Sequence, residues 1–303
     1  MLDLKTLEVF VWIARLGSYR AAAEKLNTTQ PALTGRIQKL EARLGVTLFD
    51  RGARGATLTA TGRTLLDYAE RMLALRAEAL RHVAADGAIQ GIVRLGVSET
   101  IVHTWLPLLI ERTHSTHPQV TLEIEVDTTP NLRAGLLDHR LDLAFLLGPL
   151  SDPRTVSQPL SSYPMAWVAR PDLLPKGAAV DQTTLRSWPI ITYPRNTRPY
   201  MAIRERLARA GEAPPRIYAN ASLSTIVRMA LDGIGIAAIP PVLVATDLAA
   251  GRLVVLPSAV TLPPMTFTAT WTLTPDRHVA EAIATLACSV AAAAPFAADL
   301  PDQ

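Results

Sequence analysis

The sequence has little cysteine and no long apolar run. It contains one cysteine, Cys288, among 303 residues, so it offers no internal disulfide and no thiolate metal cluster. No apolar segment reaches the roughly 18 residues that a membrane-spanning helix needs. Charged residues such as Asp3, Lys5 and Glu8 interrupt the first apolar segment, which predicts an amphipathic helix rather than a secretory signal. We therefore expect a cytoplasmic protein with no membrane partner.

The sequence also lacks the patterns of common catalytic sites. It contains no Gly-x-Ser-x-Gly segment, no phosphate-binding loop and no dinucleotide-binding fingerprint. The six histidines are scattered, and His114 and His117 form a surface pair that nothing completes into a metal site. We predict no enzyme, no catalytic residue, no metal ion and no cofactor other than a small-molecule effector.

The net charge of +3 is unevenly distributed along the chain. Residues 1–85 contain 13 Lys and Arg against 8 Asp and Glu, whereas the remainder contains 17 against 19. A basic amino-terminal part on a mildly acidic body is typical of a nucleic-acid reader joined to a domain with another task. Charge alone leaves a chance asymmetry open, so the interpretation depends on the motifs of this part.

Residues 18–44 predict two helices joined by a short polar turn. Ser18 is placed to cap the first helix, and the side chains of residues 27–29 compete for backbone hydrogen bonds and end it. A proline suits the first turn of a helix, so the second helix should begin near Gln30-Pro31 and extend to residue 44. Its predicted buried stripe consists of Leu33, Ile37, Leu40 and Leu44.

This segment, AAAEKLNTTQPALTGRIQKLEARLGVTLFDR, is followed by Arg54 and by LTATG at residues 58–62. The ordered series resembles the winged helix-turn-helix of the LysR-type transcriptional regulators. Gly35 departs from the family, in which a bulkier or charged residue is usual, so base preference cannot be carried over. For Arg51 an internal ion pair is almost as good an explanation as DNA contact. The DNA-contacting residues that we predict are Thr29, Gln30, Pro31, Thr34, Arg36, Gln38, Lys39, Arg51 and Arg54.

Residues 61–87 are predicted to form a long linker helix after the wing. Apolar residues at 66, 69, 73, 80 and 83 follow a three-four repeat, and a narrow seam of this kind needs a partner helix. The simplest partner is the same helix of a second subunit. This pairing would present two DNA-binding domains to an inverted-repeat operator in double-stranded DNA. The resemblance implies a homodimer or homotetramer.

After residue 87, short β-rich segments alternate with helices, which favours α/β architecture with largely parallel sheets. Two βαβ units predict two lobes, with long strands near 164–169 and 265–273 as a double hinge. The predicted organisation is multi-domain: an all-α winged helix-turn-helix domain (1–60), a linker helix (61–87) and a two-lobed effector domain (88–303). Lobe I comprises residues 88–163 and 268–303, and lobe II comprises 164–267. The resemblance implies a fold similar to periplasmic solute-binding proteins.

In open α/β sheets, small molecules bind beyond the carboxyl ends of strands, near helix amino termini. Four loops meet this rule, and LysR-type proteins bind effectors at the matching positions. Thr129 and Ser222 have a purely structural alternative as helix caps, and loop arginines are usually solvated. An inward arginine would pair with a carboxylate, so a small organic anion is the expected effector. The predicted effector-binding residues are Ser98, Thr100, Thr128, Thr129, Arg195, Asn196, Thr197 and Ser222.

The sequence therefore predicts a DNA-binding transcriptional regulator whose promoter binding or bending responds to a small organic effector. RNA polymerase is the further expected partner. A cytoplasmic two-lobed α/β enzyme is one alternative, although no nucleophile-base pair supports it. A solute-binding protein is the other, and the basic amino-terminal domain opposes it. Binding of DNA by residues 1–90 at low salt distinguishes the three.

Overall fold

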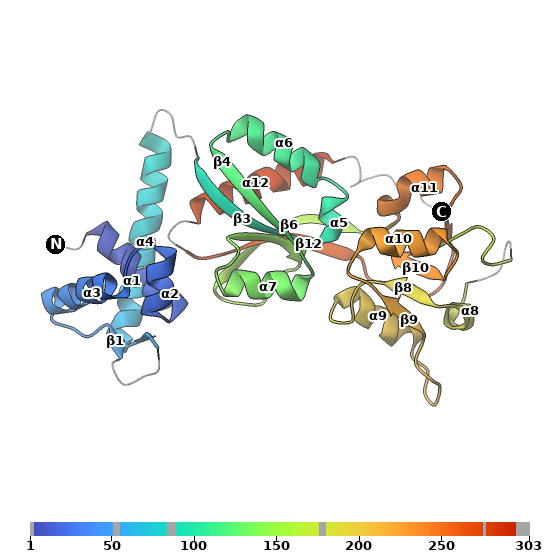
Figure 1. The fold of residues 1–303 in the computed structure, drawn as a ribbon, viewed down its shortest axis with the longest axis horizontal. Helices are drawn as coiled ribbons and strands as arrows, with labels where there is room; N and C mark the ends of the chain where they lie inside the picture. Colours follow the sequence, from blue (N-terminus) through green and yellow to red (C-terminus); the bar gives the residue numbers. More distant parts are fainter. Residues whose placement is uncertain (1–2, 51–54, 84–88, 176–179, 275–276, 295–303) are drawn as a thin grey trace. The chain divides into compact units, whose positions relative to one another are not determined.

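The computed structural model describes residues 3–50, 55–83, 89–175, 180–274 and 277–294 (Figure 1). The chain divides into two compact units, each described separately below. The first comprises residues 1–91 with 272–282, and the second comprises residues 92–271 with 283–303.

The first unit begins with three helices and a two-stranded hairpin, followed by a long helix. Ser18 caps the second helix as predicted, because its Oγ accepts a hydrogen bond from the backbone N–H of Ala21 at 3.3 Å. The third helix covers the residues that the Gln-Pro start predicted, and it ends at Gly45, which has a φ of 68°. The elements are α1 (Leu4–Leu16), α2 (Tyr19–Lys25), α3 (Gln30–Leu44), β1 (Phe49–Asp50), β2 (Thr57–Leu58) and α4 (Ala60–Val83).

The core of this unit is built from α1 together with the inner face of α3. Phe10 and Ile37 are almost completely buried in it, and the ring of Phe10 packs 5.4 Å from that of Phe49. Leu33 and Leu40 are also buried, as predicted, but the prediction for Leu44 is wrong, since 36% of it is exposed. Leu44 is the last residue of α3, where the helix has passed the edge of the core.

The wing is attached to the helices by polar contacts that explain much of the motif in residues 41–62. The carboxylate Oε1 of Glu41 accepts hydrogen bonds from the backbone N–H groups of Leu48 and Phe49 at 2.7 and 3.3 Å. The Oγ1 of Thr59 donates to the Thr47 carbonyl at 2.8 Å and accepts from the Gly62 N–H at 3.0 Å. Glu41 therefore joins α3 to the wing, and Thr59 satisfies a free donor at the start of α4.

The apolar surface of α4 differs from the predicted seam. Ala69 and Leu73 belong to the core of their own unit, with 0% and 4% exposure. The exposed apolar side chains are instead Tyr68, Met72 and Leu75. The apolar repeat of the sequence correctly indicated an apolar face on α4, but α1 of the same chain covers that face. Of the remaining seam positions, the side chains of Leu80 and Val83 lie outside the described part of α4.

The second unit contains two five-stranded sheets, which define its lobes. In lobe I the strand order is β4-β3-β5-β12-β6, with β3 parallel to β5 and β12 antiparallel to it. Buried leucines of α7 pack with Ala144 and Leu146 of β5, while Phe145 contacts Trp105 at a ring distance of 5.4 Å. The elements are β3 (Gly91–Val97), α5 (Glu99–Val102), α6 (Leu106–Thr116), β4 (Val120–Val126), α7 (Thr129–Leu137), β5 (Leu143–Leu147), β6 (Thr155–Tyr163), β12 (Met265–Thr272) and α12 (His278–Ala293), the first residues of which, up to Ala282, fall in the first unit.

In lobe II the strand order is β11-β7-β10-β8-β9. Strands β10, β8 and β9 are parallel, and β7 is antiparallel to β10 and β11. The elements are β7 (Ala166–Ala169), α8 (Gln182–Ser187), β8 (Ile190–Thr192), α9 (Arg198–Leu207), β9 (Ile217–Ala219), α10 (Leu223–Leu231), β10 (Ile236–Ile239), the short 3-10 helix η1 (Pro241–Val244), α11 (Ala245–Ala249) and β11 (Val254–Leu256).

Three features of the second unit differ from the sequence prediction. Both sheets are mixed rather than largely parallel. The chain passes between lobes in the short connections after β6 and β11, while β7 and β12 each lie wholly in one sheet. The helices α5 and α8 and the strand β6 were not predicted. Strand β6 pairs at the sheet edge and contains Pro159, which only an edge strand accommodates easily.

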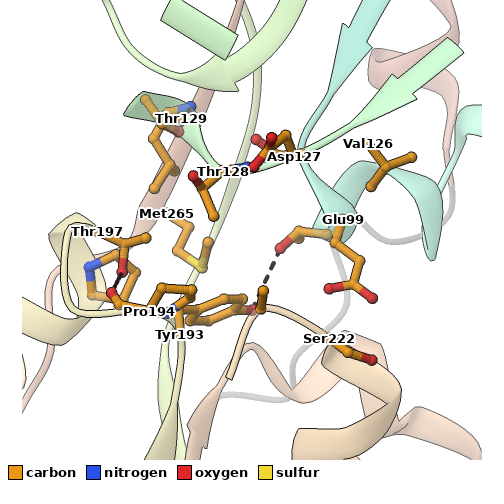
Figure 2. A pocket seen from close by; sticks show the side chains of 15 residues that line it. Glu99, Val126, Asp127, Thr128, Thr129, Tyr193, Pro194, Thr197, Ser222 and Met265 are labelled. Atoms are coloured by element: carbon orange, nitrogen blue, oxygen red, sulfur yellow. Dashed lines mark hydrogen bonds between the residues drawn. The ribbon is translucent and has the colours of Figure 1, made fainter. Parts of the chain in front are cut away.

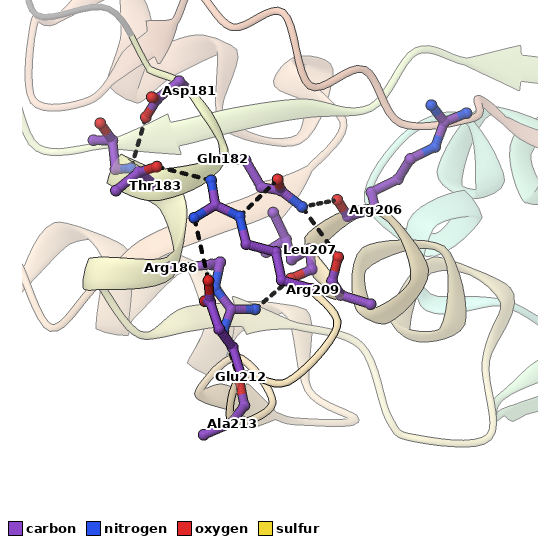
Figure 3. Close-up of polar contacts among 11 residues, drawn as sticks. Asp181, Gln182, Thr183, Arg186, Arg206, Leu207, Arg209, Glu212 and Ala213 are labelled. Atoms are coloured by element: carbon purple, nitrogen blue, oxygen red, sulfur yellow. Dashed lines mark hydrogen bonds and ion pairs between the residues drawn. The ribbon is translucent and has the colours of Figure 1, made fainter.

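Arginine and glutamine side chains cover the carboxyl-terminal end of α9 (Figure 3). Arg186 donates to the carbonyls of Leu207 and Ala213 and pairs with Glu212. Gln182 donates to the Arg206 and Ala208 carbonyls at 2.9 and 3.3 Å. These bonds satisfy carbonyl groups that a helix end leaves without partners, so we assign this cluster a structural role in lobe II.

Candidate functional sites: a helix surface and a cavity between two lobes

The surface of α3 away from the core carries most of the predicted DNA-contacting residues. Its amino-terminal residues Thr29, Gln30 and Pro31 are exposed, and so are Gln38 and Lys39 farther along. Thr34 and Arg36 are half-buried. The structure therefore presents amide and ammonium groups on one accessible helix face, which suits base edges and phosphates in a major groove.

Two details of this surface concern donors and shape. The hydroxyl of Thr34 donates to the Gln30 carbonyl at 3.0 Å, so its proton is already committed inside the helix. At Gly35, no atom of the described residues other than the neighbouring residues and the local helix backbone lies within 4 Å of the place a β-carbon would take. The helix is therefore open and flat at this point. The predicted contacts Arg51 and Arg54 lie outside the described residues.

A cavity of about 310 Å³ lies where the strand ends of the two lobes of the second unit meet (Figure 2). Lobe I contributes the turn between β3 and α5, the turn between β4 and α7, and single residues of β5 and β12. Lobe II contributes the segments between β8 and α9 and between β9 and α10. The lining residues are Ser98, Glu99, Thr100, Val126, Asp127, Thr128, Thr129, Leu147, Tyr193, Pro194, Thr197, Pro199, Ala221, Ser222 and Met265.

Most of the predicted effector-binding residues line this cavity, namely Ser98, Thr100, Thr128, Thr129, Thr197 and Ser222. The predictions for Arg195 and Asn196 are not supported, because both are exposed and absent from the lining. They occupy the outer part of the turn before α9, where their side chains reach solvent. The nearby Arg198 is exposed and donates to the Gly148 carbonyl at 3.2 Å. The expected organic anion therefore has no arginine in the lining to pair with.

Several lining hydroxyls are bound within the protein. Ser222 caps α10, because its Oγ accepts from the Thr225 N–H at 3.4 Å. The Oγ1 of Thr129 accepts from the Leu147 N–H at 3.1 Å, so Thr129 joins two elements of lobe I. Thr197 donates to the Pro194 carbonyl at 2.6 Å. These three side chains thus shape the cavity in addition to facing it.

Besides the bond from Arg198 to the Gly148 carbonyl, two hydrogen bonds between lining residues or their neighbours connect the lobes. The hydroxyls of Thr100 and Tyr193 are 3.4 Å apart. The backbone N–H of Leu223, at the first turn of α10, donates to the Glu99 carboxylate at 2.7 Å. Burial raises the pKa of the Tyr193 phenol well above its usual range, and the nearby Glu99 carboxylate adds to this rise. Tyr193 is therefore a neutral donor or acceptor at physiological pH.

Thr128 differs from these lining residues in its hydrogen bonding. Its Oγ1 is buried and has no hydrogen-bond partner among the described residues. A buried hydroxyl without a partner costs stability. Because Thr128 faces the cavity (Figure 2), a polar atom of a bound molecule would supply the missing partner.

Sequence reasoning missed the two charged residues of the lining, Glu99 and Asp127. Both stand beside predicted residues, in the loops that the strand-end rule selected. The rule selects a loop but does not say which side chain turns inward. Among the described residues, no group of three or more histidine, cysteine or carboxylate side chains could hold a metal ion. Within the same residues, no helix is both long and apolar enough to cross a membrane.

Comparison with known families finds two matches along the chain. Residues 4–63 match the bacterial regulatory helix-turn-helix proteins of the lysR family. Residues 86–289 match the LysR substrate binding domain. Together the two matches cover nearly all of the described chain.

Individual relatives are also regulators. The chain is 32% identical over 255 residues to the uncharacterized HTH-type transcriptional regulator YusT of Bacillus subtilis, covering 84% of each chain. It is 30% identical over 241 residues to the HTH-type transcriptional regulator CzcR of Bacillus thuringiensis, covering 79% of this chain and 78% of CzcR.

Solved structures show a similar fold over nearly the whole chain. ArgP from Mycobacterium tuberculosis matches with a TM-score of 0.65 at 20% identity, covering 97% of this chain and 98% of ArgP. LysG from Corynebacterium glutamicum, a full-length structure with bound effector Arg, matches with a TM-score of 0.65 at 16% identity, covering 97% and 99%.

Proposed function

We propose that this chain, which belongs to the LysR family of bacterial transcriptional regulators, responds to a small organic molecule. When that molecule occupies the cavity between the two lobes, the binding of the chain to promoter DNA changes. The observation that carries the proposal is the cavity itself. It is lined from both lobes by hydroxyl groups and contains an unpartnered one, Thr128. Pockets with a few convergent polar groups on an apolar wall are typical of small-molecule sites. LysG has the effector Arg bound, which indicates the size of molecule that a protein of this fold binds.

The DNA-contacting residues in this proposal are those that α3 exposes. Thr29, Gln30 and Pro31 stand at the end of the helix that enters the groove, while Gln38 and Lys39 lie farther along the same accessible surface. Lys39 suits phosphate, since it carries a point charge, and Gln38 suits a base edge, because its amide both donates and accepts. The wing arginines Arg51 and Arg54 complete the proposed contact set.

The proposed assembly is a homodimer, or a tetramer of two dimers, that reads an inverted repeat. The exposed residues Tyr68, Met72 and Leu75 of α4 are spaced at i, i+4 and i+7, which is the repeat of a two-helix seam. We propose this stripe as the helix-pairing surface. We further propose that the protein acts in the cytoplasm, contacts RNA polymerase and has no catalytic activity.

Ligand binding can act on DNA through the balance between two forms of the second unit. A molecule that touches both lobes favours the form in which the lobes are close, and it does so only by its difference in affinity for the two forms. The bonds of Thr100 with Tyr193 and of Glu99 with Leu223 already join the lobes. The ligand would therefore add its contacts to those that already join the two lobes.

A gel-shift titration of the full chain on promoter DNA tests the proposal. The matched variants are Lys39→Ala and Gln38→Ala, which remove neighbouring exposed side chains of α3. Lys39→Ala should weaken binding to specific and random DNA alike and reduce the salt dependence, whereas Gln38→Ala should weaken mainly the specific site. If the chain binds no DNA even at low salt, the proposed function is wrong.

A further inference from the structure

The charge of the cavity indicates which class of molecule it binds. Among its lining residues, Glu99 and Asp127 are the charged side chains, and no lysine or arginine belongs to the set. The imidazole of His103 approaches the Glu99 carboxylate at 3.8 Å but is not part of the lining. Any charged ligand therefore meets two carboxylates and no compensating cation.

Two of the places where an anion could bind are already occupied by the protein's own carboxylates. Helix amino termini attract anions through their free N–H groups, and the lining includes the starts of α5, α7, α9 and α10. At α10, the N–H of Leu223 is bound by Glu99 at 2.7 Å. At α7, the N–H of Thr128 is bound by Asp127 at 2.6 Å, and the same Asp127 oxygen accepts from the Asn131 amide at 2.9 Å. The protein's own carboxylates thus each occupy one backbone donor at these two helix starts.

These bonds leave acceptor capacity on the carboxylates. Within the described part of the chain, the Oδ2 of Asp127 accepts no hydrogen bond, and an ionised carboxylate offers about four lone-pair sites. The rest of the wall is apolar or carries hydroxyls, including the unpartnered one of Thr128. An ammonium or guanidinium group has only donors to offer, so it matches this set of acceptors.

We propose that the effector is a small organic cation, an amine or guanidine compound whose positive charge is balanced by Glu99 and Asp127. This inference rests on the proposed function of the cavity. An aliphatic or flat carbon skeleton fits the remaining wall, which includes Val126, Leu147 and Met265. The unpartnered hydroxyl of Thr128 provides one further hydrogen bond. An anion would face both carboxylates, with no lysine or arginine in the lining to balance them.

Thermal-shift and calorimetric titrations of the full chain at constant pH and ionic strength test this proposal. The probes are cadaverine, agmatine, L-lysine and L-arginine as cation carriers, glutarate and 2-oxoglutarate as anions, and 1,5-pentanediol as the neutral five-carbon analogue. Stabilisation by at least one cation carrier, with no stabilisation by the anions, supports the proposal. Stabilisation by an anion, or by none of the probes, overturns it.

Variants that remove the charge of a carboxylate but keep its shape show whether Glu99 and Asp127 cause the preference for a cation. Asp127→Asn should weaken binding of the cation about tenfold or more, the loss expected for one charged hydrogen bond. Glu99→Gln keeps an acceptor for the Leu223 N–H, and the double variant should also admit glutarate better than the parent chain. The control Glu123→Gln removes an exposed carboxylate of β4 outside the lining and should change neither result.

Gel shifts on the same preparations separate this inference from the proposed function. If the chain binds DNA but the bound compound keeps its affinity in both Asp127→Asn and Glu99→Gln, the cation assignment is wrong and the regulator assignment stands. If no DNA is bound while a cation binds with the expected charge dependence, the proposed function fails and the cavity assignment stands.

Discussion

The backbone carbonyl oxygen of Leu48 lies 2.2 Å from the position that a β-carbon on Gly62 would take. Gly62 stands in the first turn of α4, with its N–H on the Thr59 hydroxyl, and the strand of the wing crosses directly against it. Only a residue without a side chain permits this approach. The glycine of the Leu58-Thr59-x-x-Gly62 motif thus has a packing role at the joint of wing and linker helix.

Gly62→Ala should therefore destabilise the first unit by roughly 1–3 kcal/mol, the usual range for overpacking. Gly35→Ala provides the opposite case, since the space around Gly35 is open and alanine is favoured over glycine inside a helix by about 1 kcal/mol. Calorimetric melts of the full chain, following the transition of the first unit, would measure both. Equal effects of the two substitutions would show that helix propensity alone, rather than the Leu48 contact, governs Gly62.

Thr128→Val should separate ligand binding from stability. The buried hydroxyl of Thr128 has no partner among the described residues, so its removal should leave the melting temperature of the free chain unchanged or slightly higher. Affinity for a cavity ligand found by thermal shift should fall about fivefold, the value of one ordinary hydrogen bond. DNA affinity without ligand should not change.

Thr113→Val is the matched control for this substitution. The hydroxyl of Thr113 is also buried without a partner among the described residues, but it lies in α6, outside the cavity lining. It should leave ligand affinity unaltered. A similar loss of ligand affinity in both variants would remove Thr128 from the proposed site.

The sequence predicted helix positions well where local signals were strong. Gln30-Pro31 at one end and Gly45 at the other define α3, because proline suits the first turn and glycine readily takes the left-handed backbone at the end. Strand β6 was missed since its polar residues and Pro159 do not show the apolar pattern of a central strand. Whether a strand lies at the edge of a sheet depends on the whole sheet, so the sequence of the strand alone does not reveal it.

The cavity was predicted in outline but not in charge. The strand-end rule selected the correct loops, since it depends on chain direction, which the order of elements already gives. Side-chain direction within a loop depends on tertiary contacts. Glu99 turns toward α10 because a helix amino terminus lies there, whereas Arg195 is exposed in the outer part of the turn before α9. The expectation of an organic anion rested on arginines that do not line the cavity, and the charge of the effector stays a prediction.

The exposed stripe of α4 should control assembly. Leu75 is 65% exposed and lies between Met72 and Ala79 on the same face of the helix. Leu75→Glu should place charges against each other in a paired seam and shift the protein toward monomer, with weaker binding to an inverted repeat. Light scattering coupled to gel filtration measures the assembly. Leu75→Met, which keeps an apolar side chain in the stripe, is the control and should assemble as the parent chain does; a dimeric Leu75→Glu protein would exclude the stripe as the pairing surface.

Tyr193 should make the second unit sensitive to alkaline pH. Burial raises the pKa of its phenol in the folded protein above the usual value of 10.0. When the chain unfolds, the phenol returns to that value and loses its proton above it. Unfolding then releases a proton, so stability falls as pH rises above about 10, by up to roughly 1.4 kcal/mol per pH unit.

Tyr193→Phe should remove this dependence, because phenylalanine fills the same space and has no proton to release. At neutral pH the variant loses only the long 3.4 Å contact with Thr100, so its melting temperature should be close to that of the parent chain. Tyr218, which is 45% exposed, supplies the control, and Tyr218→Phe should retain the parent's alkaline slope. If melting temperatures measured between neutral pH and pH values above about 10 fall equally steeply in the parent and in Tyr193→Phe, the buried phenol does not cause the alkaline instability.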